Sequence, residues 1–78
     1  MKLPRDVTSE HLMRVLEGLG YKKTRQTGSH IRLTNPGPPP HSVTVPFTYC
    51  VHIKTLNSII SSVSVNLHKS KNEIIAML

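Results

Sequence analysis

The middle of this 78-residue chain contains basic, hydroxyl and imidazole side chains but no carboxylate between Glu17 and Glu73. Two-metal nucleases hold Mg²⁺ with clustered carboxylates, and most glycosidases need a pair of them. Both classes are therefore disfavoured, and any chemistry in this stretch has to use His, Lys, Arg, Ser or Tyr. His30 stands out because an imidazole transfers protons near neutral pH and because Arg32 follows two residues later.

The cations around His30 form a group with no interleaved acids. Its members are Lys22, Lys23, Arg25 and Arg32. A solvated charged surface is the ordinary explanation of such a group, but the lack of acids favours a functional basic patch. Ten Lys and Arg against four Asp and Glu give a net charge of +6. This excess predicts a polyanionic partner, most simply a nucleic acid, bound with an affinity that falls steeply with salt.

Other chemistry is poorly supported. The spacings of the five histidines match no zinc motif, so neither a metal nor another cofactor is expected. The single cysteine, Cys50, cannot form an internal disulfide and is expected to be a small buried apolar residue. No apolar run reaches the roughly 18 residues of a membrane span, and the first residues lack the apolar stretch of a signal peptide. A cytoplasmic protein without membrane contact is expected.

Three helices are predicted. The first covers residues 8–19, where Thr8 caps the start and Gly20 ends the helix. Its apolar stripe consists of Leu12, Val15, Leu16 and Leu19. A second helix is expected from Lys54 to about Ser62, with the stripe Ile53, Leu56, Ile59, Ile60 and Val63. A capping box from Ser70 to Glu73 predicts a short third helix.

Three strands are predicted between the first two helices. Residues 21–26 and 29–34 flank a turn at Thr27-Gly28, and residues 42–45 follow a proline-rich loop at 35–40. Alternation along 29–34 places Ser29, Ile31 and Leu33 toward the core and sends His30 and Arg32 to the solvated face. Residues 47–52 are left open as a loop whose packing is undecided. The expected architecture is one α+β domain over residues 1–78, ordered α-β-β-β-α-α, with helices on one face of an antiparallel sheet.

The stretch Gly28-Ser29-His30-Ile31-Arg32-Leu33, after a first helix that ends in Leu19-Gly20-Tyr21, resembles the HicA (YcfA-like) family of toxins from bacterial type II toxin–antitoxin systems. The resemblance starts at Lys2, resumes at Val43-Thr44-Val45-Pro46 and at Thr55-Leu56, and covers nearly the whole chain in order. It implies a fold similar to a double-stranded-RNA-binding domain, a metal-independent ribonuclease that cleaves mRNA, and a cognate HicB antitoxin as partner. The family's catalytic histidine corresponds to His30.

General chemistry agrees with that role, since RNA cleavage needs a base for the ribose 2′-hydroxyl and cations for the phosphate. Arg32, together with Arg25 or Lys23 across the hairpin, is expected to bind the phosphate. Lys22, Gly28 and Ser29 are further candidates for RNA contact, although Gly28 and Ser29 are also explained as turn residues. His41 and Lys23 are the candidates for a second acid–base group.

One segment departs from the family pattern. Relatives have a polar, basic stretch that ends in Gly-Thr-Leu after the third strand, whereas this chain has an apolar stretch from Phe47 to Leu56 with Lys54 in place of the glycine. This departure leaves open a degenerate toxin that binds only its antitoxin. An RNA-binding module that does not cleave is a separate alternative.

Overall fold

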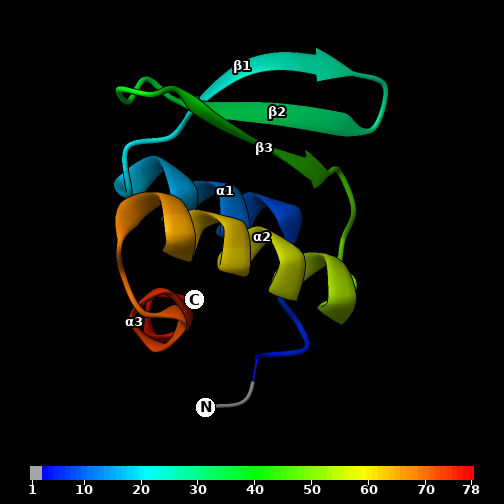
Figure 1. The fold of residues 1–78 in the computed structure, drawn as a ribbon. Coiled ribbons are helices and arrows are strands. Elements are labelled where there is room, and N and C mark those ends of the chain that lie inside the picture. The colour runs from blue at the N-terminus through cyan, green and yellow to red at the C-terminus, as the bar shows by residue number, and fades with distance from the viewer. Residues whose placement is uncertain (1–2) are drawn as a thin grey trace.

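The computed structural model describes residues 3–78, so Lys2, where the resemblance starts, lies outside the described residues. The elements are α1 (Ser9–Gly18), β1 (Lys22–Thr27), β2 (His30–Asn35), β3 (His41–Pro46), α2 (Ile53–Leu67) and α3 (Lys71–Ala76). The strands form one antiparallel sheet in the order β1-β2-β3. In Figure 1, α1 and α2 lie beneath one face of this sheet, and α3 lies on their far side. The predicted α+β order of elements is confirmed.

The core lies between the sheet and the helices. Along β2, Ile31 and Leu33 are buried while His30 and Arg32 are exposed, as the alternation predicts. Leu12 and Leu16 of α1 and Leu56 and Ile60 of α2 are also buried, and they form one cluster with the β2 residues. Because Ile31 and Leu33 occupy the inner side of β2, alternation along the strand leaves His30 and Arg32 on the outer face.

The helix signals in the sequence are largely confirmed. Thr8 Oγ1 accepts from the His11 backbone N–H at 3.1 Å, and Ser70 Oγ accepts from that of Glu73 at 3.2 Å. α2 continues to Leu67 rather than ending near Ser62, because Leu67 still packs against the core. None of the helices within residues 3–78 is long and apolar enough to cross a membrane.

The turn between β1 and β2 consists of Gly28 and Ser29. Gly28 has a φ of +58°, and a glycine with positive φ at the first of two loop positions is the pattern of a type II′ turn. Ser29 therefore lies in the turn rather than in the strand. It is exposed, and the expectation that it faces inward is wrong, because strand alternation begins only at His30.

The segment between β3 and α2, left open by the sequence, is a loop. Val51 is buried at 2% exposure, whereas Phe47 and Tyr49 are exposed. Cys50 is also exposed, so the expectation that it is buried is wrong. Its thiol donates to the Arg5 carbonyl oxygen at 3.0 Å, which explains how a surface loop accommodates it.

Candidate active site

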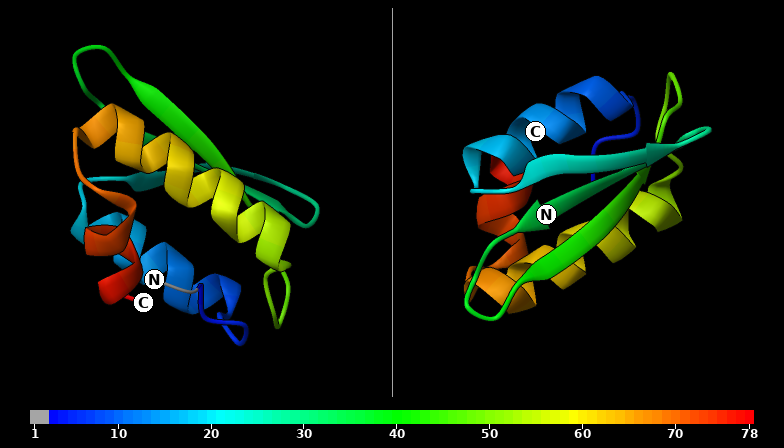
Figure 2. Two further views of the ribbon diagram at one scale, coloured as in Figure 1. Left: turned by 60° about the horizontal axis from the view of Figure 1, so that its bottom comes forward. Right: turned by 90° about the horizontal axis from the view of Figure 1, so that it is seen from above.

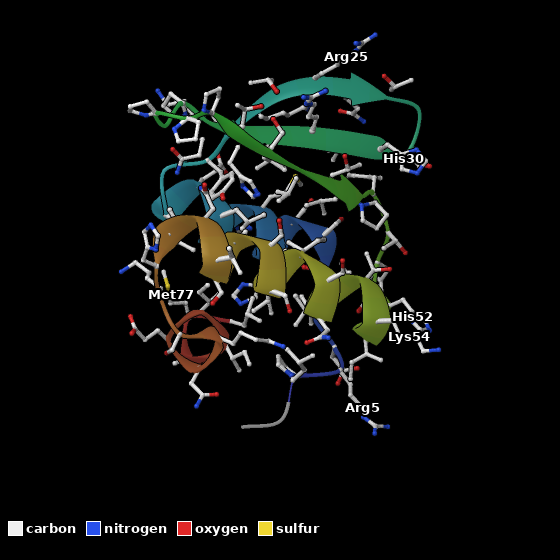
Figure 3. All side chains as sticks on the ribbon, viewed as in Figure 1. Arg5, Arg25, His30, His52, Lys54 and Met77 are labelled. Atoms are coloured by element: carbon white, nitrogen blue, oxygen red, sulfur yellow. The ribbon has the colours of Figure 1, made fainter. Side chains whose placement is uncertain are left out.

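His30 is the first residue of β2 and lies directly after the turn. In register it is paired with Thr27 of β1 and Pro46 of β3. Its side chain is exposed at the hairpin end of the sheet, as Figure 3 shows. The right view of Figure 2 looks onto the outer face of the sheet, where no helix covers the strands. The imidazole is therefore accessible to a large ligand.

Two arginines accompany His30 on this face. Arg32 follows it by two residues along β2, and Arg25 is the direct partner of Arg32 on β1. Arg25, Thr27, His30, Arg32 and Thr44 line one shallow hollow of about 200 Å³. All five lining side chains are cationic, imidazole or hydroxyl groups, so the hollow matches the chemistry of an anion.

A row of hydroxyl groups crosses the three strands beside the arginines. Thr34 Oγ1 lies 3.1 Å from Thr24 Oγ1 and 2.9 Å from Ser42 Oγ. Arg32 Nη2 donates to the same Ser42 Oγ at 3.3 Å. The row thus orients the guanidinium of Arg32. Sequence reasoning missed these residues, although their alternation on the outer face of β2 and β3 is a usable signal.

The lysines of the predicted basic group do not join the hollow. β1 contains an irregularity between Lys23 and Arg25, so that Lys23 is paired with buried Leu33 while Arg25 is paired with exposed Arg32. Lys23 lines a different hollow, beside Glu17 and other residues of α1. Lys23 and Arg25 are two positions apart and would share a face in a regular strand. The extra residue between them shifts the alternation by one and places them on opposite faces.

Lys22 lies at the other end of the sheet from His30. It is paired with Thr34, four residues along β2 from His30, which corresponds to roughly 14 Å at about 3.4 Å per residue. The structure therefore brings together His30, Arg25 and Arg32, with Gly28 and Ser29 in the adjoining turn, and it separates both lysines from them.

His41 does not provide a second acid–base group for His30. It opens β3 and is paired with Asn35, so it lies at the far end of β2 from His30. Its Nδ1 is 2.6 Å from Tyr21 Oη, and its Nε2 is 2.9 Å from Ser62 Oγ. These bonds connect the core to α2, and they give His41 a structural role.

Tyr21 is fully buried beside His41. Their rings meet edge to face at 77°, with 5.8 Å between the centroids. Asn66 Nδ2 donates to Tyr21 Oη at 3.1 Å. Burial raises the pKa of the Tyr21 hydroxyl, and the hydrogen bond from Asn66 partly offsets this increase. The side chain therefore stays neutral, with its hydroxyl satisfied.

No group of three or more His, Cys, Asp or Glu side chains placed to hold a metal ion occurs among residues 3–78. The two ion pairs of the same residues, Arg14 with Glu10 at 3.9 Å and Lys69 with Glu73 at 4.0 Å, involve neither arginine of the hollow. Within the described residues, the guanidiniums of Arg25 and Arg32 thus have no carboxylate partner.

Comparison with known proteins identifies the family of the chain. The family model described as the HicA toxin of bacterial toxin–antitoxin systems matches residues 9–71, from the start of α1 to the start of α3. No curated protein and no solved structure matches the chain. The family match includes the turn, all three strands and α2, and so contains every residue of the hollow. The chain therefore belongs to the HicA toxin family of bacterial toxin–antitoxin systems.

Proposed function

We propose that this toxin is an endoribonuclease in which His30 transfers protons while Arg25 and Arg32 bind a phosphate of the RNA. The observation that carries the proposal is the hollow on the outer face, where an exposed imidazole lies beside two guanidiniums with no carboxylate in the lining. Membership of a toxin family supports it, because cleavage of mRNA is a direct way to arrest growth.

The facing arginines support binding of an anion. Arg25 and Arg32 are direct cross-strand partners, and like charges in this position destabilise a sheet. A phosphate placed between them removes the repulsion and accepts hydrogen bonds from both guanidiniums. The unfavourable pairing in the free protein is therefore understandable as part of a binding site.

The reaction follows from the groups present. His30 takes the proton of a ribose 2′-hydroxyl, and the 2′-oxygen then attacks the adjacent phosphorus. The bond from phosphorus to the 5′-oxygen breaks, and this oxygen receives a proton from the imidazolium or from water. The products are a 2′,3′-cyclic phosphate and a 5′-hydroxyl, and the arginines stabilise the charge on the phosphoryl oxygens. No step requires a metal ion.

Membership of the family implies a cognate antitoxin. We propose a HicB-type protein that places acidic or bulky groups over the hollow, because exposed cations without carboxylate partners attract such a surface and accelerate association.

A second candidate function is an RNA-binding module that does not cleave. The observation that favours it is that the lining of the hollow contains no acid–base side chain besides His30. A single imidazole then has to serve as base and acid in turn, or to rely on water.

Replacing His30 with glutamine tests the proposal. The wild-type chain is expected to cleave single-stranded RNA in the presence of EDTA, and H30Q is expected to lose at least about 100-fold in rate, since general acid–base catalysis contributes roughly that much. The measurement is the initial rate on a labelled oligonucleotide, with mass spectrometry of the product ends.

The matched control is H11Q, because His11 is an exposed histidine on α1 outside the hollow. It is expected to cleave like the wild type. A correctly folded H30Q with undiminished cleavage contradicts the proposal. A wild-type chain that binds RNA and leaves it whole supports the second candidate instead.

A further inference from the structure

The loop between β3 and α2 exposes two large aromatic side chains. Phe47 is 55% and Tyr49 is 89% exposed, whereas the only other aromatic residue of the Phe, Trp and Tyr types, Tyr21, is fully buried. Two of three such residues thus lie unburied in one short loop. Such exposure suggests a binding role, because aromatic surface is normally removed from water.

The backbone of this loop is held in place from both sides. Ser9 Oγ donates to the Thr48 carbonyl oxygen at 2.9 Å and lies 3.3 Å from the Thr48 nitrogen. The Val51 N–H donates to the Val7 carbonyl oxygen at 2.8 Å. Ser9 and Val51 are both buried. Phe47 and Tyr49 therefore project from a fixed backbone, and a ligand that stacks on them does not have to order the loop first.

The loop starts beside the candidate catalytic residue. The Phe47 N–H donates to the Ser29 carbonyl oxygen at 2.6 Å, which ties the loop to the turn before His30. His30 is the cross-strand partner of Pro46, and residues paired in this way have Cα atoms about 5 Å apart. Phe47, the first residue of the aromatic pair, therefore directly follows Pro46, the cross-strand partner of His30.

The space beside the aromatic rings suits a base better than a phosphate. A hollow of about 520 Å³ is lined by Thr8, Ser9, Glu10, Phe47, Thr48 and Tyr49. The carboxylate of Glu10 repels a phosphate, but it accepts hydrogen bonds from the exocyclic amino groups of bases. The rings offer stacking surface, and the hydroxyls offer polar contacts at its rim.

Basic side chains lie on both sides of the aromatic loop. His30 is on one side, and Arg5, His52 and Lys54 are on the other, at the same end of the molecule in Figure 3. The hydrogen bond from Cys50 to Arg5 and the adjacency of His52 to Val51 join this second group to the loop. Aromatic residues between cations form the usual platform for single-stranded nucleic acid.

We propose that Phe47 and Tyr49 are a stacking platform for an unpaired base of the RNA, close to the phosphate held at His30. The inference rests on the proposed ribonuclease function and deepens it, since it makes the substrate single-stranded and makes this loop a determinant of the cleavage site. The RNA strand passes from Arg25 and Arg32, over the hairpin end, to Lys54.

A double-mutant cycle between protein and RNA tests the platform. The full-length wild type and Y49A act on oligonucleotides in which a single nucleotide near the cleavage site lacks its base. At the stacked position, loss of the base is expected to lower the wild-type kcat/KM roughly 10-fold, within the range of one base–aromatic stack, and to leave that of Y49A unchanged. F47A is tested in the same way.

Two variants serve as controls. Y49F keeps the ring and is expected to behave like the wild type. V65A removes another exposed apolar side chain, 77% exposed on α2 and absent from the lining of the aromatic hollow. It is expected to leave the rate, the cleavage sites and the sensitivity to base removal unchanged. Thermal unfolding of each variant confirms that the fold is retained.

The outcomes separate this inference from the proposed function. If the wild type and V65A cleave RNA while Y49A and F47A show the same rates, sites and sensitivity to base removal, the platform is refuted and the nuclease proposal stands. If Y49A and F47A cleave normally but lose binding to the antitoxin, the loop is a protein interface and the platform is again refuted. A wild type that neither binds nor cleaves RNA overturns both proposals.

Discussion

At the scale of single residues, the position of His30 follows from its neighbours. Ile31 and Leu33 are buried against the helices, and alternation along β2 then leaves His30 and Arg32 on the uncovered face. His41 shows the opposite case. Both of its ring nitrogens are hydrogen-bonded between the core and α2, so its role is structural rather than catalytic.

Tyr21 predicts how stability depends on pH. Because burial raises the pKa of its hydroxyl above 10.0, the unfolded chain loses this proton at a lower pH than the folded chain does. The neutral Tyr21 hydroxyl contributes fully to the free energy of unfolding below pH 10.0. This contribution is lost as the pH rises through the pKa of the folded state. Urea unfolding of the wild type between pH 9 and pH 11 is therefore expected to show a declining free energy of unfolding.

The variant Y21F isolates this effect. It cannot ionise, so its free energy of unfolding is expected to decline less over the same pH range. At neutral pH it is expected to be about 1–3 kcal/mol less stable than the wild type, because His41 and Asn66 lose a buried partner. If the free energies of unfolding of Y21F and wild type decline in parallel with pH, the decline does not come from ionisation of Tyr21.

At the scale of elements, the β1–β2 hairpin decides which side chains reach the hollow. Its turn begins with Gly28 at positive φ, and its first strand contains the irregularity between Lys23 and Arg25. The irregularity turns Lys23 toward α1 and leaves Arg25 opposite Arg32. The hairpin therefore selects two cations of the predicted basic group of four for the site.

Two alanine substitutions test the role of the turn. A Cβ at Gly28 or at Gly18 meets no atom within 4 Å, but only Gly28 has a positive φ. G28A is therefore expected to lower the free energy of unfolding by about 1 kcal/mol, and G18A, near the end of α1, is expected to raise it by about 0.5 kcal/mol. Chemical denaturation measures both values, and equal effects of the two variants contradict this account.

The same pair of variants links the turn to the site. Because the turn positions His30, G28A is expected to cleave RNA more slowly than the wild type, whereas G18A is expected to match it.

At the scale of the whole molecule, one face of the sheet packs against the helices and the other face is exposed to solvent. Both long helices cover the inner face of the three-stranded sheet, so the outer face remains available to a large ligand (Figures 1 and 2). With a net charge of +6, the molecule attracts a polyanion over a distance, and the arginines of the outer face then hold it locally.

Salt dependence measures this contribution. The affinity of H30Q for a short single-stranded RNA is expected to fall linearly in a plot of log K against log salt. R25Q and R32Q, each made in the H30Q background, are expected to reduce the slope by about 0.7, the value for one phosphate contact on a single strand. K23Q serves as the control with an unchanged slope, because Lys23 lies beside α1. Equal slopes for all three variants contradict the assignment of the arginines.

The sequence by itself determined the order of the elements and the side of β2 on which His30 lies. Helix stripes, strand alternation and caps are short-range patterns. Leu12, Ile31 and Ser70 belong to such patterns, and residues within a few positions of each are enough to recognise them. The resemblance to the HicA family, confirmed by the family match, came from the same continuous stretch around His30.

Only the tertiary structure decided which residues accompany His30. The faces of Lys23 and Arg25 depend on an irregularity in strand pairing, and the exposure of Phe47, Tyr49 and Cys50 depends on contacts with residues near 5–9. The partners of His41 come from Tyr21 and Ser62, about 20 positions away on either side. Contacts of this range leave no periodic trace in the local sequence, because they are established only when distant segments pack together.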